Sequence, residues 1–292
     1  MGYELDKDNM ILPGNFQIPI AKNCNLHCHY CGFMDYNGQG LQTIDKSMNL
    51  DDIKIIEKTI LDLGFKFSSI ELFGGEPTIN SYFTEIVEYL ATRKGIFFNK
   101  LKLFTNGLNM TKKVVGVLNH FDRIDISTYP IENHTISEYR EIWDSSNIAK
   151  KLSDVDVCVH GRTHFFHSTD FELPKDADIK KLFQACFQKD NCRVVTMDGI
   201  YRCGMIHHEK TEIYKYDKKI LEDGFINNED EPLKFCSSCD ETKVAYLNQT
   251  NDTSAEAYLQ WKRPNTKEWV SNNPKVDKRN YERGIELIKN YQ

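Results

Sequence analysis

The chain has 292 residues, of which 40% are hydrophobic and 27% are charged, and its formal net charge is −6. This ordinary globular composition provides enough chain for one barrel-sized unit and a small appendage. The acidic balance argues against a general nucleic-acid binder, and no stretch approaches the roughly 18 apolar residues that a membrane-spanning helix needs. The first residues are polar and contain no apolar signal segment, so we expect a cytoplasmic protein without a membrane partner.

Apolar segments alternate between strand-like and helix-like patterns, which predicts a βα architecture. Strands are expected at six places along the chain: 16–20, 69–73, 101–104, 123–127, 155–159 and 163–167. Helices are expected between them, at 51–63, 82–93 and 111–118. The segment 262–292 is locally basic, and we expect it to contain a terminal helix with solvated basic side chains. Because functional loops of parallel βα folds follow the carboxyl ends of the strands, motifs at those ends should share one rim.

Three cysteines follow the first expected strand with the spacing C-x3-C-x2-C: Cys24, Cys28 and Cys31. Three closely spaced thiolates can hold three corners of a [4Fe–4S] cluster and leave its fourth iron open to a small molecule. A zinc site is the alternative, although zinc sites favour paired cysteine knuckles completed by a distant second pair. Without an export signal, the nine cysteines of the chain indicate metal ligands rather than disulfides.

On this motif the sequence resembles the radical S-adenosylmethionine (radical SAM) superfamily over roughly residues 14–170. The resemblance implies a partial (β/α)6 TIM-type barrel in the α/β class. It also implies that Cys24, Cys28 and Cys31 hold a catalytic [4Fe–4S] cluster that binds SAM. In that family, reductive cleavage of SAM yields a 5′-deoxyadenosyl radical, which abstracts hydrogen from a substrate.

Further residues match the SAM-binding positions of that family. The segment Gly74-Gly75-Glu76-Pro77 ends the second expected strand and resembles the motif whose backbone and carboxylate receive the SAM ammonium. Tyr30 stands at the aromatic position near adenine, and Asn106 and Ser127 end the third and fourth strands, where polar SAM contacts are expected. Three of these features also have a simpler interpretation, as a Gly-Gly turn, a packed tyrosine and a Thr-Asn-Gly turn.

A second group of cysteines lies further along the chain. Asp198-Gly199 predicts a β-hairpin between a cysteine and Cys203, and a later C-x2-C pair follows. This arrangement resembles the Twitch domain, a short form of the SPASM extension that holds one auxiliary [4Fe–4S] cluster. The implied ligands are Cys186, Cys203, Cys236 and Cys239, with Cys192 as the alternative to Cys186. Only three residues separate Gly199 from Cys203, one fewer than in the family, and a structural zinc ribbon is the other interpretation.

These resemblances predict three parts: a radical SAM barrel at 1–175, a Twitch-like hairpin and helix extension at 176–245, and a tail with a helix at 246–292. The expected cofactors are two [4Fe–4S] clusters and SAM, and the expected partners are a small substrate and a reductant such as flavodoxin or ferredoxin.

The pattern around Cys186 to Cys203 is similar to that of radical SAM proteins associated with sugar modification, which favours a carbohydrate or polyol substrate. A ribosomal peptide is the runner-up, and a non-catalytic iron–sulfur or zinc protein is the rival class. His160, His164 and His167 lie near the fifth and sixth expected strands, and one hypothesis is that they face the substrate. Cys158 is expected to be a buried structural thiol, and no catalytic base is assigned.

Overall fold

The computed structural model covers residues 1–292 and describes residues 9–26, 46–128, 136–161, 173–186, 193–203, 213–227 and 278–292, together with positions 232, 236 and 246. Their strands form one sheet in the order β5-β4-β3-β2-β1-β6-β7-β8. The strands are β1 (Met10–Ala21), β2 (Phe65–Gly74), β3 (Phe98–Thr105), β4 (Arg123–Thr128), β5 (Asp156–Gly161), β6 (Arg193–Thr196), β7 (Gly199–Tyr201) and β8 (Ile213–Tyr214). In this order, every neighbouring pair from β5 through β6 is parallel. The pairs β6–β7 and β7–β8 are antiparallel.

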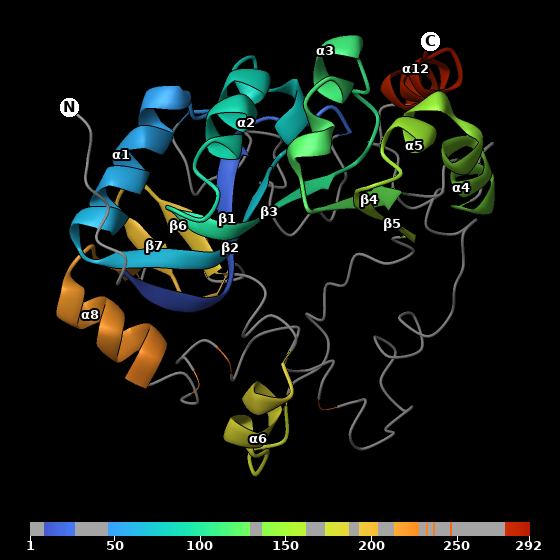
Figure 1. The fold of residues 1–292 in the computed structure, drawn as a ribbon. Coiled ribbons are helices and arrows are strands. Elements are labelled where there is room, and N and C mark those ends of the chain that lie inside the picture. The colour runs from blue at the N-terminus through green and yellow to red at the C-terminus, as the bar shows by residue number, and fades with distance from the viewer. Residues whose placement is uncertain are drawn as a thin grey trace.

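The helices lie mostly along one side of this curved sheet (Figure 1). They are α1 (Leu50–Asp62), α2 (Phe83–Ala91), α3 (Lys112–Val115), α4 (Ile136–Ser145), α5 (Asn147–Lys151), α6 (Ile179–Gln184), α8 (Lys218–Glu222) and α12 (Lys278–Lys289). Two short 3-10 helices, η1 (Pro77–Ile79) and η2 (Leu118–His120), and the π-helix η4 (Asp223–Asn227) complete the described elements. The terminal helix α12 packs beside α4, far from α1 and α8 at the other end of the sheet.

Local sequence explains why α1 forms where it does. Asn49 caps the helix by accepting a 3.1 Å bond from the Asp52 main-chain N–H, and the Asp52 carboxylate accepts a bond from the Asn49 N–H in return. This reciprocal capping box satisfies two main-chain donors that a helix start leaves unpaired. Ile53, Ile56 and Ile60 then follow at helical spacing and are buried. The predicted helix at 51–63 is therefore confirmed.

The two faces of the sheet differ in chemistry, as β4 shows. Ile124 and Ile126 are fully buried in the main hydrophobic core together with residues of the covering helices. Asp125 and Ser127 alternate with them and therefore point to the opposite, inner face. Because side chains alternate across a strand, the parallel sheet presents an apolar surface to the helices and a polar surface within its curve.

The hairpin predicted around Asp198-Gly199 is present as β6 and β7, with Thr196 paired to Gly199. Beyond that prediction, β6 pairs in parallel with β1 and so continues the barrel sheet. The side chain of Arg193 fixes this junction. It donates a hydrogen bond to the carbonyl of Pro13, and its guanidinium lies 5.4 Å from the ring centre of Phe16 and 5.3 Å from that of Phe225.

Most predicted elements are confirmed, and most strands are longer than expected. The helix predicted at 111–118 is shorter, because α3 ends at Val115 and a separate 3-10 turn follows. The strand expected at 163–167 lies outside the described residues. The terminal helix exists, but only one side of it is solvated: Arg279 and Arg283 are exposed, whereas Tyr281, Ile285 and Ile288 are buried.

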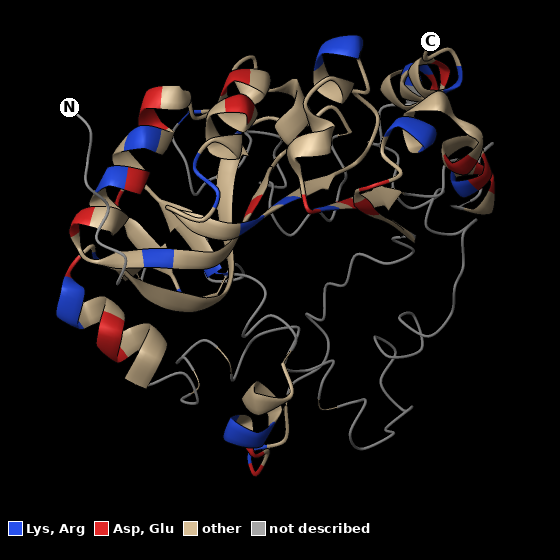
Figure 2. Ribbon diagram, in the orientation of Figure 1, with Lys and Arg blue, Asp and Glu red and all other residues tan. Residues whose placement is uncertain are grey.

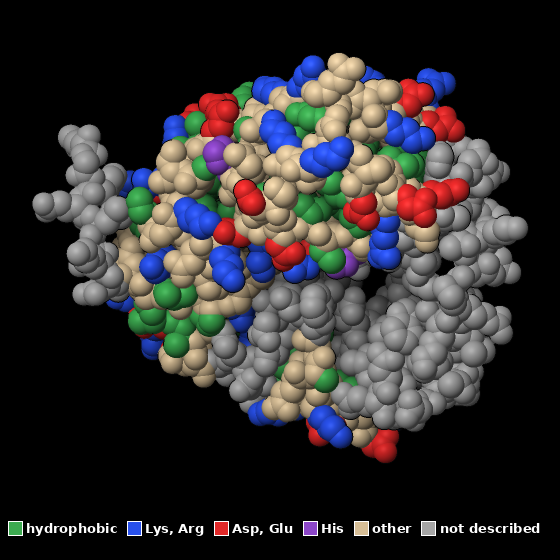
Figure 3. Space-filling view, turned by 45° about the vertical axis from the view of Figure 1, so that its right-hand side comes forward, with side chains coloured by type: hydrophobic (Ala, Val, Ile, Leu, Met, Phe, Trp, Pro, Cys, Tyr) green, Lys and Arg blue, Asp and Glu red, His purple; other side chains and the backbone are tan. Residues whose placement is uncertain are grey.

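Most of the charged residues lie on the helices, and fewer lie on the strands (Figure 2). On the face shown in Figure 3, acidic and basic side chains are interspersed over the described part of the chain, and neither sign forms a continuous surface. Within the described residues, no helix is both long and apolar enough to cross a membrane.

Candidate active site at the carboxyl ends of the strands

The Gly-Gly-Glu segment runs directly against the backbone that leads into Cys24. The N–H of Gly75 donates to the carbonyl of Ala21 over 2.7 Å, and the N–H of Glu76 donates to the carbonyl of Asn23 over 2.8 Å. A Cβ atom added to Gly75 would lie 2.1 Å from that Asn23 oxygen, far inside contact distance. Gly75 is therefore required by close backbone approach, and the motif is built against the first cysteine of the triad.

The carboxylate of Glu76 is buried and accepts four hydrogen bonds. Its Oε1 accepts from the Thr78 N–H (3.1 Å), the Thr78 hydroxyl (2.6 Å) and the Thr105 hydroxyl (2.6 Å). Its Oε2 accepts from the main-chain N–H of Asn106 over 2.7 Å. Pro77 begins the 3-10 turn η1, for which Glu76 is the N-cap. The carboxylate thus links the loop after β2 to the loop after β3.

Glu76 is also a buried acid without a cationic partner in the described structure. Burial raises the pKa of its carboxyl group, and the hydrogen bonds from Asn106, Thr105 and Thr78 oppose that rise. None of the ion pairs among the described residues includes Glu76. By contrast, buried Glu57 is paired with Arg93 at 2.5 Å. A bound cation would therefore stabilise the ionised form of the Glu76 carboxyl group, which burial alone disfavours.

Asn106 connects Glu76 to the cysteine loop. Its side-chain Nδ2 donates to Asn25 Oδ1 over 2.6 Å and lies 3.9 Å from the Sγ of Cys24. The N–H of Leu26 also points to that sulfur over 3.5 Å. Donors directed at a sulfur favour its thiolate form, which is the form that binds metal. Cys24 therefore has surroundings that suit a cluster ligand, while Cys28, Cys31 and Tyr30 lie outside the described residues.

The terminal helix also reaches this site, which was not predicted. Asn280 donates from Nδ2 to the main-chain carbonyl of Asn25 over 3.0 Å. A Cβ on Gly284 would lie 2.6 Å from the side chain of Leu108, so α12 packs closely on the loop after β3. The signal in the sequence was the spacing of Tyr281, Ile285 and Ile288, which places three apolar side chains on one helical face.

Ser127 stands one strand beyond Asn106, at the carboxyl end of β4. It is buried, and it pairs in register with His160 on β5. Asp125, two residues earlier on the same face, accepts bonds from Arg123 at 2.8 and 2.7 Å. Burial acts to raise the pKa of Asp125, but hydrogen bonds and charge from Arg123 and His160 outweigh it and leave that pKa below its usual value.

The inner face continues as a polar surface on β1 and β2. Gln17 donates to Oε2 of Glu71 over 2.6 Å, and Asn15 donates to the same oxygen over 3.2 Å. Burial raises the pKa of Glu71 despite these bonds. The side-chain amide oxygen of Gln17, Oε1, is buried and has no hydrogen-bond partner in the described structure. This buried acceptor, which motif analysis did not identify, is available to a ligand hydroxyl or N–H.

The second cysteine group is described only in part. Cys203 packs against a small hydrophobic cluster that includes Cys236, Phe183 and Tyr201. Cys186 lies two residues after the end of α6 and is half-buried. Cys192 and Cys239 lie outside the described residues, so the ligand set of an auxiliary cluster stays a prediction.

Comparison with known proteins agrees with the fold and with the first motif. Residues 18–157 match the Radical SAM superfamily. The GTP 3′,8-cyclase of Clostridium perfringens (strain 13) is 26% identical over 250 residues, which cover 82% of this chain and 74% of that protein. The Haemophilus ducreyi GTP 3′,8-cyclase is 34% identical over 98 residues, covering 34% of this chain and 27% of that protein.

Among solved structures, native anSMEcpe with bound AdoMet has a TM-score of 0.50 with 14% sequence identity, covering 95% of this chain and 100% of that one. This likeness shows a shared fold. The match of residues 18–157 to the Radical SAM superfamily and the GTP 3′,8-cyclase relatives together indicate that the chain is an enzyme.

Proposed function

We propose that this chain cleaves SAM at a [4Fe–4S] cluster held by Cys24, Cys28 and Cys31. When bound, the cluster and SAM supply a 5′-deoxyadenosyl radical that removes hydrogen from a substrate. The observation that carries the proposal is Glu76, a buried carboxylate without a cation partner among the described residues, built against the backbone of Cys24. An ammonium group of SAM is the cation that this site would accept.

The remaining SAM contacts follow from position. Gly74 and Gly75 allow the backbone close approach, and Pro77 starts the turn that directs Thr78 onto Glu76. Asn106 contacts both Glu76 and Cys24, so it would lie beside both the amino acid part of SAM and the cluster. Ser127 is proposed to contact the ribose and Tyr30 the adenine, in keeping with their motif positions.

We propose that the substrate contains a sugar or a polyol, and that hydrogen is removed from one of its carbinol carbons. The sequence pattern of the second cysteine group favours a carbohydrate or polyol. The relatives are named for joining positions 3′ and 8 of GTP, and position 3′ is a ribose carbon. Both lines therefore lead to hydrogen removal from a sugar carbon, in a free sugar or in a purine nucleotide. The amides, carboxylates and free acceptor of the inner face suit hydroxyl-rich ligands.

We further propose that Cys186, Cys203, Cys236 and Cys239 hold an auxiliary [4Fe–4S] cluster in a Twitch-like extension, with Cys192 as the alternative to Cys186. Such a fully ligated cluster would supply an electron acceptor, which makes a two-electron oxidation the expected net reaction. The β6–β7 hairpin and the shared packing of Cys203 and Cys236 support this assignment. A flavodoxin or ferredoxin is the expected reductant.

SAM cleavage with and without the Glu76 charge tests the proposal. Reconstituted wild-type protein with dithionite should release 5′-deoxyadenosine, and Glu76→Gln should weaken SAM binding at least about tenfold, because a charge-assisted hydrogen bond contributes about 1.5–3 kcal/mol. The matched control is Glu57→Gln, which removes another buried carboxylate, on α1, whose partners are Arg93 and Tyr89. Equal SAM affinity in both variants and the wild type would place the SAM site elsewhere.

Deuterium transfer tests the substrate class. With GTP deuterated on the ribose, or a polyol deuterated at its carbinol carbons, label should appear in 5′-deoxyadenosine. Label that appears only from the Cα or Cβ of a peptide would replace the sugar proposal with a ribosomal peptide substrate.

A further inference from the structure

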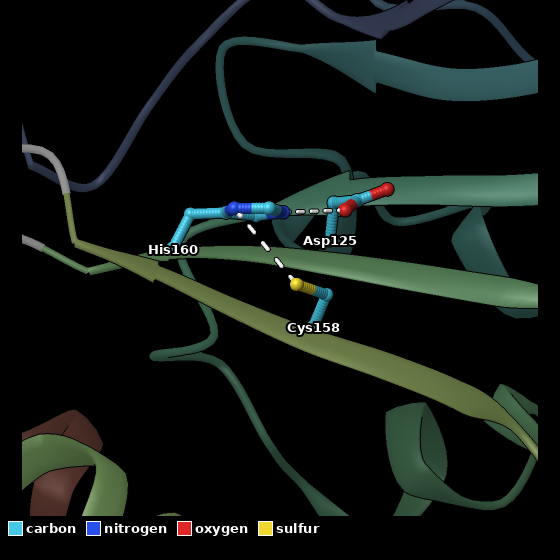
Figure 4. A group of neighbouring side chains, drawn as sticks. All are labelled: Asp125, Cys158 and His160. Carbon is cyan, nitrogen blue, oxygen red and sulfur yellow. Dashed lines mark hydrogen bonds and ion pairs between the residues drawn. The ribbon is translucent and has the colours of Figure 1, made fainter.

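Three side chains outside the SAM site gather on the inner face of β4 and β5 (Figure 4). Asp125 and Cys158 are directly paired across the two strands, and His160 follows Cys158 on the same face. Their candidate ligand atoms all lie within 4.8 Å of one another. Cys158 was expected to be a buried structural thiol, but it is half-buried and lies beside an imidazole, so it faces a functional group instead of the core.

The contacts of the imidazole favour proton transfer over metal binding. Nε2 of His160 lies 2.6 Å from Oδ1 of Asp125, whereas Nδ1 lies 3.9 Å from Sγ of Cys158. One metal ion binds one ring nitrogen, yet the two neighbours contact opposite nitrogens. In addition, the guanidinium of Arg123 contacts both oxygens of Asp125. A divalent ion there would face a fixed positive charge at short range.

The same contacts specify one tautomer of His160. Asp125 is held as a carboxylate by Arg123, so it accepts a proton-bearing nitrogen, and Nε2 is the nitrogen that it meets. Nδ1 is then the basic nitrogen, and a thiol at Cys158 is a weak donor to it. The side chain of His160 is 37% exposed, compared with 12% for Asp125. This is the order of base and orienting acid found in proton-transfer dyads.

The position of His160 relates it to the cysteine loop. His160 pairs with Ser127, and Ser127 lies level with Asn106, because Thr105 pairs with Ile126. Adjacent strands are about 4.8 Å apart, so His160 and Asn106 are about 10 Å apart across the sheet. Asn106 itself contacts Cys24. A small substrate next to SAM would therefore lie within reach of the imidazole.

We propose that His160 is the base that takes the hydroxyl proton of the substrate, and that Asp125 positions it. This inference rests on the proposed function, in which hydrogen is removed from a carbinol carbon. In the step assigned to His160, the substrate O–H bond breaks and an N–H bond forms at Nδ1. The resulting imidazolium is stabilised by the adjacent Asp125 carboxylate, and the electron pair of the O–H bond stays on the substrate oxygen. A carbon radical that bears a hydroxyl group loses this proton more readily than the parent alcohol.

The tautomer of His160 provides a test that needs no substrate. Long-range ¹H–¹⁵N correlation spectra of the oxidised holoenzyme should show His160 with its proton on Nε2, assigned by the loss of these signals in His160→Gln. Asp125→Asn should abolish that preference. Asp156→Asn is the matched control. Asp156 also contacts Arg123, at 3.1 Å, but it is not among the described contacts of His160. A wild-type proton on Nδ1, or equal effects of the two Asp variants, would overturn the proposal.

Turnover and metal binding provide independent outcomes. With GTP or myo-inositol as the probe, the ratio of product to 5′-deoxyadenosine should fall at least about 100-fold in His160→Gln, the usual contribution of a general base. Asp156→Asn should retain the wild-type ratio. Retention of that ratio in His160→Gln would refute the role of His160.

Stoichiometric Zn²⁺ binding that is lost in both Cys158→Ser and His160→Gln would replace the base with a metal site. If the wild type released no 5′-deoxyadenosine, the proposed function would fail while the tautomer result would stand.

Discussion

The main-chain N–H of Asn106 donates to Oε2 of Glu76 over 2.7 Å. Since the side chain of Asn106 also lies beside Cys24, one residue joins the expected ammonium site to the expected cluster ligand. The main-chain bond does not depend on the side chain, so the two connections can be separated by mutation. This separation gives the first prediction.

Replacing Asn106 with alanine should lower the reduction potential of the cluster and leave the main-chain bond to Glu76 in place. Loss of an N–H directed at Cys24 Sγ removes a contact that favours the reduced, more negative cluster. Stability should fall by about 1–3 kcal/mol, because Asn25 Oδ1 and the Leu108 N–H lose their partner. An EPR-monitored redox titration measures the potential. Asn109→Ala is the control, since Asn109 bonds to the Thr78 carbonyl in the same region. A potential unchanged from the wild type would show that Asn106 does not influence the cluster.

Metal content tests the two-cluster expectation. Two [4Fe–4S] clusters correspond to about eight irons per chain after anaerobic reconstitution. Alanine at Cys24, Cys28 and Cys31 together should leave about four, because the second group of cysteines is separate. Zinc retained in stoichiometric amount by that triple variant would replace the auxiliary cluster with a structural zinc site.

Glu71 should make the folded state less stable as the pH rises. Burial raises its folded-state pKa above the ordinary value of 4.5, so the folded protein keeps a proton that the unfolded chain releases. The free energy of unfolding therefore falls as the pH increases from about 4.5 to the folded-state pKa, by about 1.4 kcal/mol for each pH unit between these two values. Glu71→Gln removes this dependence while keeping an oxygen for Gln17 and Asn15. The variant should gain stability relative to the wild type as the pH rises above the ordinary value of 4.5, as measured by chemical denaturation. A difference that stays constant over this range would contradict the prediction.

Local patterns predicted the elements well because they act within a few residues. The spacing of Ile53, Ile56 and Ile60 identified α1, and Asp198-Gly199 identified the β6–β7 hairpin. The parallel pairing of β1 to β5 agrees with the βα architecture that the alternation of strands and helices predicted. The Gly-Gly-Glu segment was expected on the same rim as the cysteine triad, and its contacts with Asn23 and Asn106 agree with that expectation.

The remaining features depend on contacts between distant parts of the chain. The pairing of β6 with β1 joins residues far apart in sequence, and no periodic signal indicates it. The threonine donors of Glu76 lie in η1 and at the end of β3, and they meet the carboxylate only because β2 and β3 are adjacent in the sheet. Likewise, Asp125 and His160 meet only because β4 and β5 pair in one particular register. Single motifs carry no information about such registers.

Gly75→Ala adds only a methyl group, but we expect it to disrupt the candidate SAM site beside Cys24. The added Cβ would lie 2.1 Å from the Asn23 carbonyl oxygen and 2.9 Å from the Cys24 nitrogen, both main-chain atoms. Relief requires the two loops to separate, which breaks the bonds from Gly75 to Ala21 and from Glu76 to Asn23. Two lost hydrogen bonds and the strain of overpacking together cost about 3 kcal/mol. Since Cys24 moves with Asn23, iron at this cluster and SAM affinity should both decrease.

Gly95→Ala separates this steric effect from ordinary backbone strain. Gly95 has a φ of +84°, but a Cβ there would meet no atom within 4 Å. Its replacement should cost about 1–2 kcal/mol through the left-handed conformation alone and leave iron content unchanged. Thermal unfolding, iron analysis and SAM binding on both variants make the comparison. If Gly75→Ala kept full iron content and wild-type SAM affinity, the close approach of the two loops would have no role in forming the site. The Gly-Gly pair would then act only as a turn.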